Sequence, residues 1–165
     1  MKRRRHIVGA AADQRGITAV EFVIVAVALF LTLFGVLEVS RAMFARTLLE
    51  EGVRRGARMA AVCPVNDAAV ARAAAYSGAG TNSTMLSGLT TANFLVQYLD
   101  QNGAVVANPG TAASFLTIRF VRVSVQNFTM PLAIPFMSAI FTPTNLSSTL
   151  PAESLGVSAT AVTAC

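Results

Sequence analysis

The chain has 165 residues, of which 54% are hydrophobic, with a formal net charge of +5 and a pI near 10.2. It is too apolar for an ordinary soluble domain, and it is long enough for one small domain beside a membrane segment. Of 13 basic and 8 acidic residues, five basic and one acidic lie at or before Gly16, which leaves eight and seven in the rest. The basicity therefore belongs to the first residues, which argues against nucleic acid as a partner.

Residues 1–16 form a short basic leader, and residues 17–39 are predicted to be a transmembrane helix. Phe22 to Leu37 carry no formal charge, and Ile17 to Leu37 make roughly 30 Å of helix, enough to cross a bilayer core. The apolar run is longer than the core of a secretory signal peptide, and no small-x-small cleavage site directly follows it. The helix is therefore expected to remain in the mature protein as an anchor.

Glu21 is an unusual residue at the start of this span. A carboxylate there costs on the order of 1–3 kcal/mol, depending on its depth in the membrane. One interpretation is a partly solvated side chain that reaches toward the lipid headgroups. The other is that the carboxylate has a function that offsets this cost, and the residues alone leave both interpretations open.

Residues 40–63 are predicted to continue the helix as an amphipathic extension, because small and apolar residues recur there at helical spacing. Two ion pairs, Glu50–Arg54 and Glu51–Arg55, are expected on its polar face. The stripe either packs on the chain's own domain or contacts neighbouring helices in a filament, since small residues let helices approach closely. Its candidate helix-packing residues are Ala42, Ala45, Gly52 and Gly56.

Residues 64–165 are expected to form a small domain with a short helix and antiparallel strands. Pro64 ends the long helix, and Asn66 or Asp67 can cap a second helix over 68–76. A β-hairpin is predicted from Phe94–Leu99 and Ala104–Ala107, with an Asn-Gly turn between them.

Two further strands and one irregular segment are expected beyond this hairpin. Phe115–Phe128 alternates like a strand, with a β-bulge at Phe120-Val121 where the apolar face switches. Gly156–Thr163 is a plausible last strand. The apolar, proline-punctuated segment Met130–Phe141 is either a buried irregular crossover or a protruding patch that contacts a partner subunit.

The residues needed for catalysis are scarce. The only histidine, His6, lies in the basic leader, so the remaining chain cannot hold a Ser-His-Asp triad, a Cys-His pair or a histidine-ligated metal. We expect no enzymatic activity, no cofactor, no metal and no small-molecule substrate.

Cys63 and Cys165 are the only cysteines. If this part of the chain lies outside the cytoplasm, both are in an oxidising compartment. A disulfide between them would tie the end of the chain to the end of the long helix. Two free thiols or an intermolecular pair are the alternatives.

The N-terminal third resembles the TadE-like pseudopilins, a type IVb family of Flp/Tad pilus systems. The resemblance covers roughly residues 14–62, and it depends on the order and spacing of several short pieces. These are Arg15-Gly16, Ala19-Val20-Glu21-Phe22, Phe34-Gly35, Glu38, Arg41 and Arg55-Gly56-Ala57-Arg58.

This resemblance implies a membrane-anchored α+β fold: a long N-terminal helix, transmembrane and then amphipathic, followed by a small extracytoplasmic domain with an antiparallel sheet. It implies cleavage between Gly16 and Ile17 by a prepilin peptidase. Glu21, followed by Phe22, would then set the register of assembly by meeting the new N-terminus of a neighbouring subunit. The expected partners are membrane lipid, the peptidase, other pilins or pseudopilins and the inner-membrane assembly platform.

The expected function is that of a minor pilin or pseudopilin of a tight-adherence pilus, either assembled into the pilus or priming it, with a role in adhesion. The alternatives are an uncleaved membrane-anchored component of the secretion apparatus and a surface adhesin that the helix only anchors. Arginine and lysine counts on the two sides of the span are equal, so charge does not decide orientation. The short N-terminal tail, the cysteines and the resemblance favour a single-pass bacterial inner-membrane protein with a cytoplasmic N-terminus and a periplasmic or extracellular domain.

Overall fold

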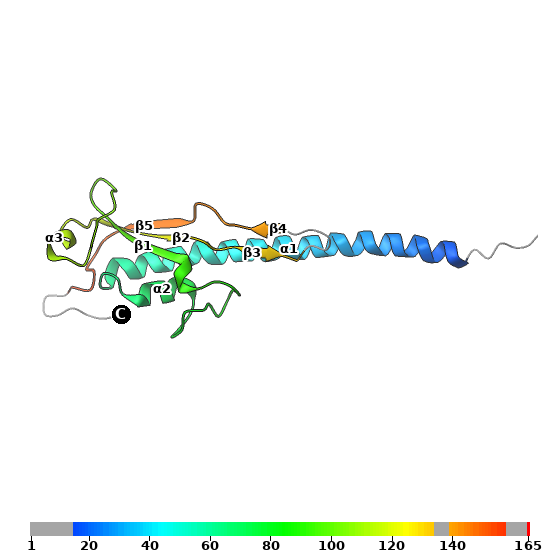
Figure 1. Ribbon diagram of the computed structural model, residues 1–165, viewed down its shortest axis with the longest axis horizontal. Helices are drawn as coiled ribbons and strands as arrows, with labels where there is room; N and C mark the ends of the chain where they lie inside the picture. Colours follow the sequence, from blue (N-terminus) through cyan, green and yellow to red (C-terminus); the bar gives the residue numbers. More distant parts are fainter. Residues whose placement is uncertain (1–14, 134–138, 158–164) are drawn as a thin grey trace, which may run out of the picture.

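A computed structural model describes residues 15–133, 139–157 and 165. The first element, α1, is a continuous helix over Arg15–Val62, 48 residues long. Figure 1 shows a small domain around the C-terminal part of α1, while the N-terminal part projects away from it. The predicted long helix and the α+β class are confirmed, and the helix has no break between residues 39 and 40.

The short second helix, α2, spans Ala68–Ala75. Its N-cap is Asp67, whose Oδ1 accepts a hydrogen bond of 2.8 Å from the Ala69 N–H, as expected for a carboxylate at this position. Tyr76 ends the helix in the left-handed conformation, with φ of 54°. The predicted helix is therefore confirmed, with Asp67 rather than Asn66 as its cap.

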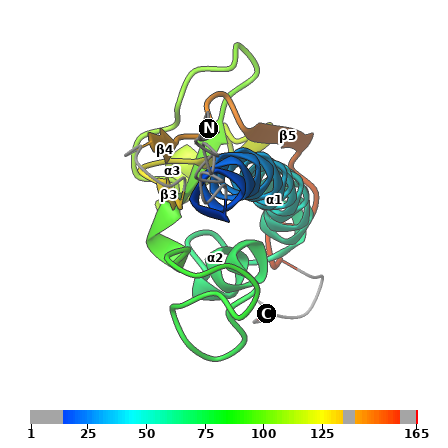
Figure 2. The same cartoon turned by 90° about the vertical axis from the view of Figure 1, so that its right-hand side faces the viewer.

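The main sheet is antiparallel, with strand order β1-β2-β5. Its strands are β1 (Phe94–Leu99), β2 (Phe120–Val125) and β5 (Ser147–Pro151). Val121 and Val123 of the central strand are fully buried and face the long helix across a shared core. Viewed along α1, the sheet and α2 enclose the helix from different sides (Figure 2).

The predicted hairpin is only half correct. Asp100 does turn the chain, because its carboxylate accepts hydrogen bonds from the backbone N–H groups of Asn102 and Ala104. Gly103 takes the positive φ of 78° that this turn requires. The chain then makes one isolated bridge, Leu99–Val105, and no strand over Ala104–Ala107. The strand partner of β1 along its whole length is β2.

The predicted strand Phe115–Phe128 is too long at both ends. Its first part belongs to a one-turn helix, α3 (Ala112–Phe115), and Leu116 after it is 72% exposed. The change of apolar face at Phe120-Val121 therefore marks the start of β2, and the predicted bulge is wrong.

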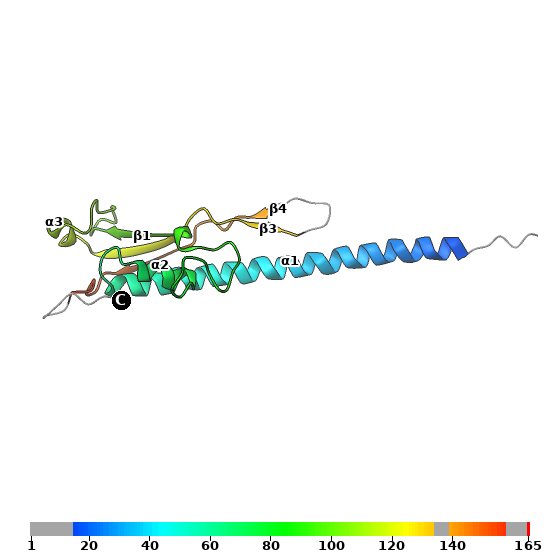
Figure 3. The same cartoon turned by 60° about the horizontal axis from the view of Figure 1, so that its bottom comes forward.

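A second, two-stranded sheet is formed by β3 (Met130–Leu132) and β4 (Ala139–Phe141), which pair antiparallel. Figure 3 shows that this β3–β4 hairpin runs beside α1, toward the projecting part of the helix. The segment is thus a hairpin and not an irregular crossover. Most of the predicted last strand, Gly156–Thr163, lies outside the described residues, and the third strand of the main sheet is β5.

The C-terminal end of α1 is capped by a segment distant in sequence. The carbonyl of Ala61 accepts from the backbone N–H of Glu153 at 3.0 Å, and the carbonyl of Val62 accepts from that of Gly156 at 2.6 Å. The last carbonyls of a helix have no hydrogen-bond donor within the helix. Backbone N–H groups of residues 153–156 donate to these carbonyls of α1. Residues 153–156 are thereby held against the end of the helix.

Gly52 and Gly56 allow α2 and the sheet to approach α1 closely. A Cβ placed at Gly52 would lie 2.6 Å from the backbone oxygen of Ala74 and 3.2 Å from the Phe94 ring. At Gly56 it would lie 2.9 Å from the Ala74 Cβ and 3.2 Å from Val123. These distances leave no room for a side chain, so the core depends on glycine at both positions.

We predict that Gly52→Ala destabilises the domain, although alanine is normally the better helix former by about 1 kcal/mol. The added methyl group meets backbone rather than a flexible side chain, so the expected net loss is about 1–3 kcal/mol. The measurement is the free energy of unfolding of the protein in detergent, followed by tyrosine fluorescence. Gly35→Ala is the matched control, since no atom lies within 4 Å of its new Cβ. An unchanged stability in Gly52→Ala would contradict the packing described.

Candidate functional site

The N-terminal part of α1, residues 16–37, is an unpartnered apolar surface. Large apolar side chains along it are exposed, among them Phe22 at 74%, Val25 at 67% and Leu37 at 62%. Within the described residues it is the one helix long and apolar enough to cross a membrane, and its most apolar stretch is not buried by the domain. Because exposed apolar surface of this size is unfavourable in water, this segment needs lipid or other helices around it.

The predicted processing residues lie in the first turn of α1. A Cβ at Gly16 would meet no atom within 4 Å, and Ile17 is 62% exposed. The described parts of the domain lie toward the other end of the helix (Figure 1). The bond between Gly16 and Ile17 is therefore far from the folded domain.

Glu21 is exposed and takes part in none of the ion pairs formed by the described residues. It lies four residues after Ile17, so the two residues are neighbours on one face of the helix. Phe22 beside it is exposed as well. The structure thus gives this carboxylate no cation within the described part of its own subunit.

A second carboxylate, Glu38, is in the opposite situation. It is only 9% exposed, and the Arg41 guanidinium donates to both of its oxygens, at 2.9 and 3.2 Å. Arg41 also donates to the Pro131 carbonyl of β3 at 3.5 Å. This Glu38–Arg41 junction, where the β3–β4 hairpin meets α1, was not predicted from the sequence, although both residues are among those that carry the family resemblance.

The candidate helix-packing residues serve the subunit's own domain. Ala45 is fully buried, Gly52 and Gly56 face α2 and the sheet, and Ala42 packs against the same core. Of the two interpretations left open by the sequence, the structure favours packing on the chain's own domain. A contact between filament helices would have to use other residues.

The polar face of α1 also differs from the expected pairing. Arg46 pairs with Glu50 at 3.0 Å and Arg54 with Glu51 at 3.5 Å. Arg55, the remaining arginine of the predicted pairs, lies over the ring of Tyr76, with its guanidinium carbon 4.7 Å from the ring centroid. The predicted pairs Glu50–Arg54 and Glu51–Arg55 are therefore wrong, because the nearby aromatic ring offers Arg55 a cation–π contact.

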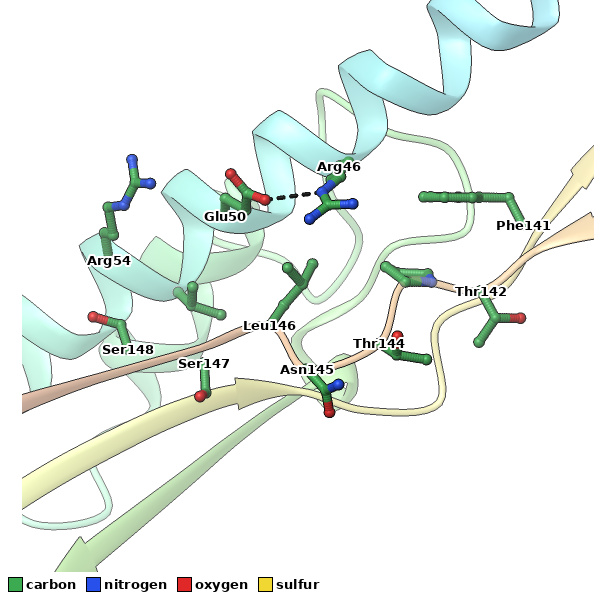
Figure 4. Close-up of a pocket in the computed structure, with 12 residues that line it drawn as sticks. Arg46, Glu50, Arg54, Phe141, Thr142, Thr144, Asn145, Leu146, Ser147 and Ser148 are labelled. Carbon is green, nitrogen blue, oxygen red and sulfur yellow. Dashed lines mark hydrogen bonds and ion pairs between the residues drawn. The ribbon is translucent and has the colours of Figure 1, made fainter.

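An open groove of about 560 Å³ lies between α1 and the segment 141–148 that joins β4 to β5. Figure 4 shows the Arg46–Glu50 pair on the helix side and Thr144, Asn145 and Ser147 on the other. The described residues include no group of three or more histidine, cysteine or acidic side chains placed to hold a metal. The groove is a mixed polar surface that was not predicted from the sequence.

Both tyrosine hydroxyls form hydrogen bonds with the backbone of other elements. Burial raises the pKa of Tyr98, whose hydroxyl oxygen accepts from the Asn66 backbone N–H at 3.1 Å. Burial also raises the pKa of Tyr76, against the smaller opposing effect of the Arg55 charge, and its hydroxyl donates to the Leu48 carbonyl at 3.3 Å. Both rings therefore act as neutral hydrogen-bonding groups that fix the loop after α1 and the end of α2.

Cys63 and Cys165 form a disulfide with Cα atoms 5.8 Å apart. It joins the residue after α1 to the last residue of the chain, beside the segment 153–156 that caps the helix. Of the arrangements that the sequence left open, the structure contains the intramolecular one.

The exposed apolar half of α1 and the domain folded around its other half are consistent with a single-pass, membrane-anchored α+β protein. Residues 16–58 match the family described as TadE-like protein, so the N-terminal module of this chain is TadE-like. This module is typical of components associated with Tad pili. No curated protein and no solved structure matches the chain, and the domain beyond residue 58 lies outside the family match.

We predict that Cys63→Ser combined with Cys165→Ser lowers the free energy of unfolding by about 2–4 kcal/mol, because the open chain gains freedom over a separation of 102 residues. Denaturant unfolding in detergent measures this change. Reducing agent should lower the stability of the unmodified protein by a similar amount and leave the double variant unaffected. If reduction changes both proteins equally, the bridge is not the cause.

Proposed function

We propose that this chain is a minor pilin or pseudopilin of a tight-adherence pilus. A prepilin peptidase cleaves it after Gly16, and the mature subunit either joins the pilus or primes its assembly, with a role in adhesion. The observation that carries this proposal is Glu21: an exposed carboxylate on an apolar helix, one turn after Ile17, with no ion pair to any described residue.

Cleavage would give Glu21 a partner. Removal of the leader leaves a free ammonium group on Ile17, and a neighbouring subunit shifted along the helix axis can place its Glu21 beside that group. Attraction between the two charges is much stronger in the low dielectric of a bilayer or a helix bundle than in water. This attraction offsets the free-energy cost of placing the carboxylate in an apolar environment, and it favours one register between subunits.

The exposed half of α1 is the surface that we assign to contacts with lipid and with other pilins. Ala45, Gly52 and Gly56 are occupied inside the subunit, whereas Phe22 and Val25 are exposed. The proposed role is structural rather than catalytic, with the inner-membrane assembly platform as a further partner.

We place the N-terminus in the cytoplasm and the domain in the periplasm or outside the cell. The disulfide supports this orientation, because such bonds persist in oxidising compartments and are rare in the cytosol. The location that follows is the bacterial inner membrane, with one span, before assembly.

The first prediction from this proposal concerns the N-terminal residue. Mass spectrometry of the membrane-extracted protein from cells with active peptidase should give Ile17 as the first residue. Gly16→Asp should leave the leader attached, because the peptidase then meets a charged side chain beside the bond. An intact Met1 in the unmodified protein would overturn the pilin assignment and favour an uncleaved component of the apparatus.

The second prediction concerns Glu21→Ala. Cleavage should proceed, but incorporation of the subunit into pili should fall by about tenfold, equivalent to about 1.4 kcal/mol of lost association energy. Quantitative immunoblotting of sheared pili measures the change. Glu51→Ala is the matched control, since it removes an exposed carboxylate of the domain whose pair with Arg54 is 3.5 Å long and contributes little. Normal incorporation of Glu21→Ala would refute the register argument.

A further inference from the structure

The β3–β4 hairpin has one apolar face turned away from the core. Pro131 pairs with Ile140 across the two strands, and both are exposed, Ile140 at 70%. The flanking pair Met130–Phe141 points the other way: Met130 is 3% exposed, and Phe141 packs against the core. Side chains alternate between the faces of a sheet, so Pro131 and Ile140 form an outward pair.

This outward pair lies at the level where α1 leaves the domain. Arg41 donates to the carbonyl of Pro131 itself, and the hairpin extends from there along α1 toward the apolar segment (Figure 3). The helix surface at this level is apolar too, since Val39 is 64%, Met43 59% and Phe44 53% exposed. Exposed apolar side chains of α1 and the outward pair of the hairpin thus lie at the same level along the helix.

The sequence around the hairpin is also poor in charged residues. Between Arg122 and Glu153 the sequence contains no charged residue. Arg41 donates a hydrogen bond to the hairpin backbone, and its side chain is 47% exposed beside the buried Glu38. An apolar face edged by an arginine is the pattern of a protein surface at the boundary between headgroups and acyl chains.

We infer that the outer face of the β3–β4 hairpin, Pro131 and Ile140, rests in the headgroup boundary of the bilayer that α1 crosses. The domain is then held to the membrane at two places, the helix and the hairpin, and this limits how far it can tilt. The occupant is the lipid surface rather than a protein, because Pro131 contacts α1 at Arg41, directly after the apolar span. This inference rests on the membrane span of the proposed function and is independent of leader cleavage.

The chain has no tryptophan, so a single introduced indole reports on its own position. The experiment uses full-length protein in phosphatidylcholine vesicles with and without brominated acyl chains. Ile140→Trp places the probe on the hairpin at a site that is 70% exposed, where a larger side chain has room. Phe30→Trp places it in the span, and Val105→Trp places it in the exposed turn after β1, at the opposite end of the domain from the hairpin.

Emission from Ile140→Trp should shift to shorter wavelength and be quenched by brominated lipid, less than Phe30→Trp and much more than Val105→Trp. Emission of Ile140→Trp that resembles that of Val105→Trp would overturn the inference. A shift to shorter wavelength without quenching, dependent on protein concentration, would also overturn it and assign the face to a second subunit. Loss of quenching in Phe30→Trp would instead show that the span itself is not in the membrane.

Discussion

The structure depends on the close packing of α1 against α2 and the sheet at Gly52 and Gly56. Backbone and side-chain atoms of Ala74, Phe94 and Val123 occupy the space that side chains at these positions would need. One helix can therefore be the centre of the domain over its C-terminal part and remain free over its N-terminal part. Without that packing, α1 would be an anchor joined to a separate domain by a hinge.

The transition between the two parts of α1 is made by polar groups at one point. Glu38 is buried beside Arg41, and Arg41 reaches the backbone of the β3–β4 hairpin. On the N-terminal side of this junction the helix is exposed and apolar. On the C-terminal side, small residues of the helix face the core. At this junction α1 and the hairpin are in contact, and the inferred contact of the domain with lipid headgroups rests on that position.

Glu21 and Glu38, the two carboxylates within residues 15–40, illustrate two solutions to the same physical problem. Glu38 is satisfied within the subunit by an arginine three residues later. Glu21 has no such partner in the described structure, so in the proposed function its counter-charge comes from another subunit. The domain, with its helix end capped by residues 153–156 and closed by the disulfide, gives that assembly surface a rigid base.

Local composition and spacing were enough to predict several features. These are the continuous helix, its apolar segment, a short second helix capped at Asn66 or Asp67, the turn at Asp100–Gly103 and the exceptional position of Glu21. The predictions failed where strand partners are distant: β1 pairs with β2, the polar strand β5 completes the sheet, and Leu116 lies outside it. The inward packing of the small-residue stripe and the position of the β3–β4 hairpin beside the span became clear from the tertiary structure alone. Both depend on which surfaces meet in space, and neighbours in the chain carry no information about that.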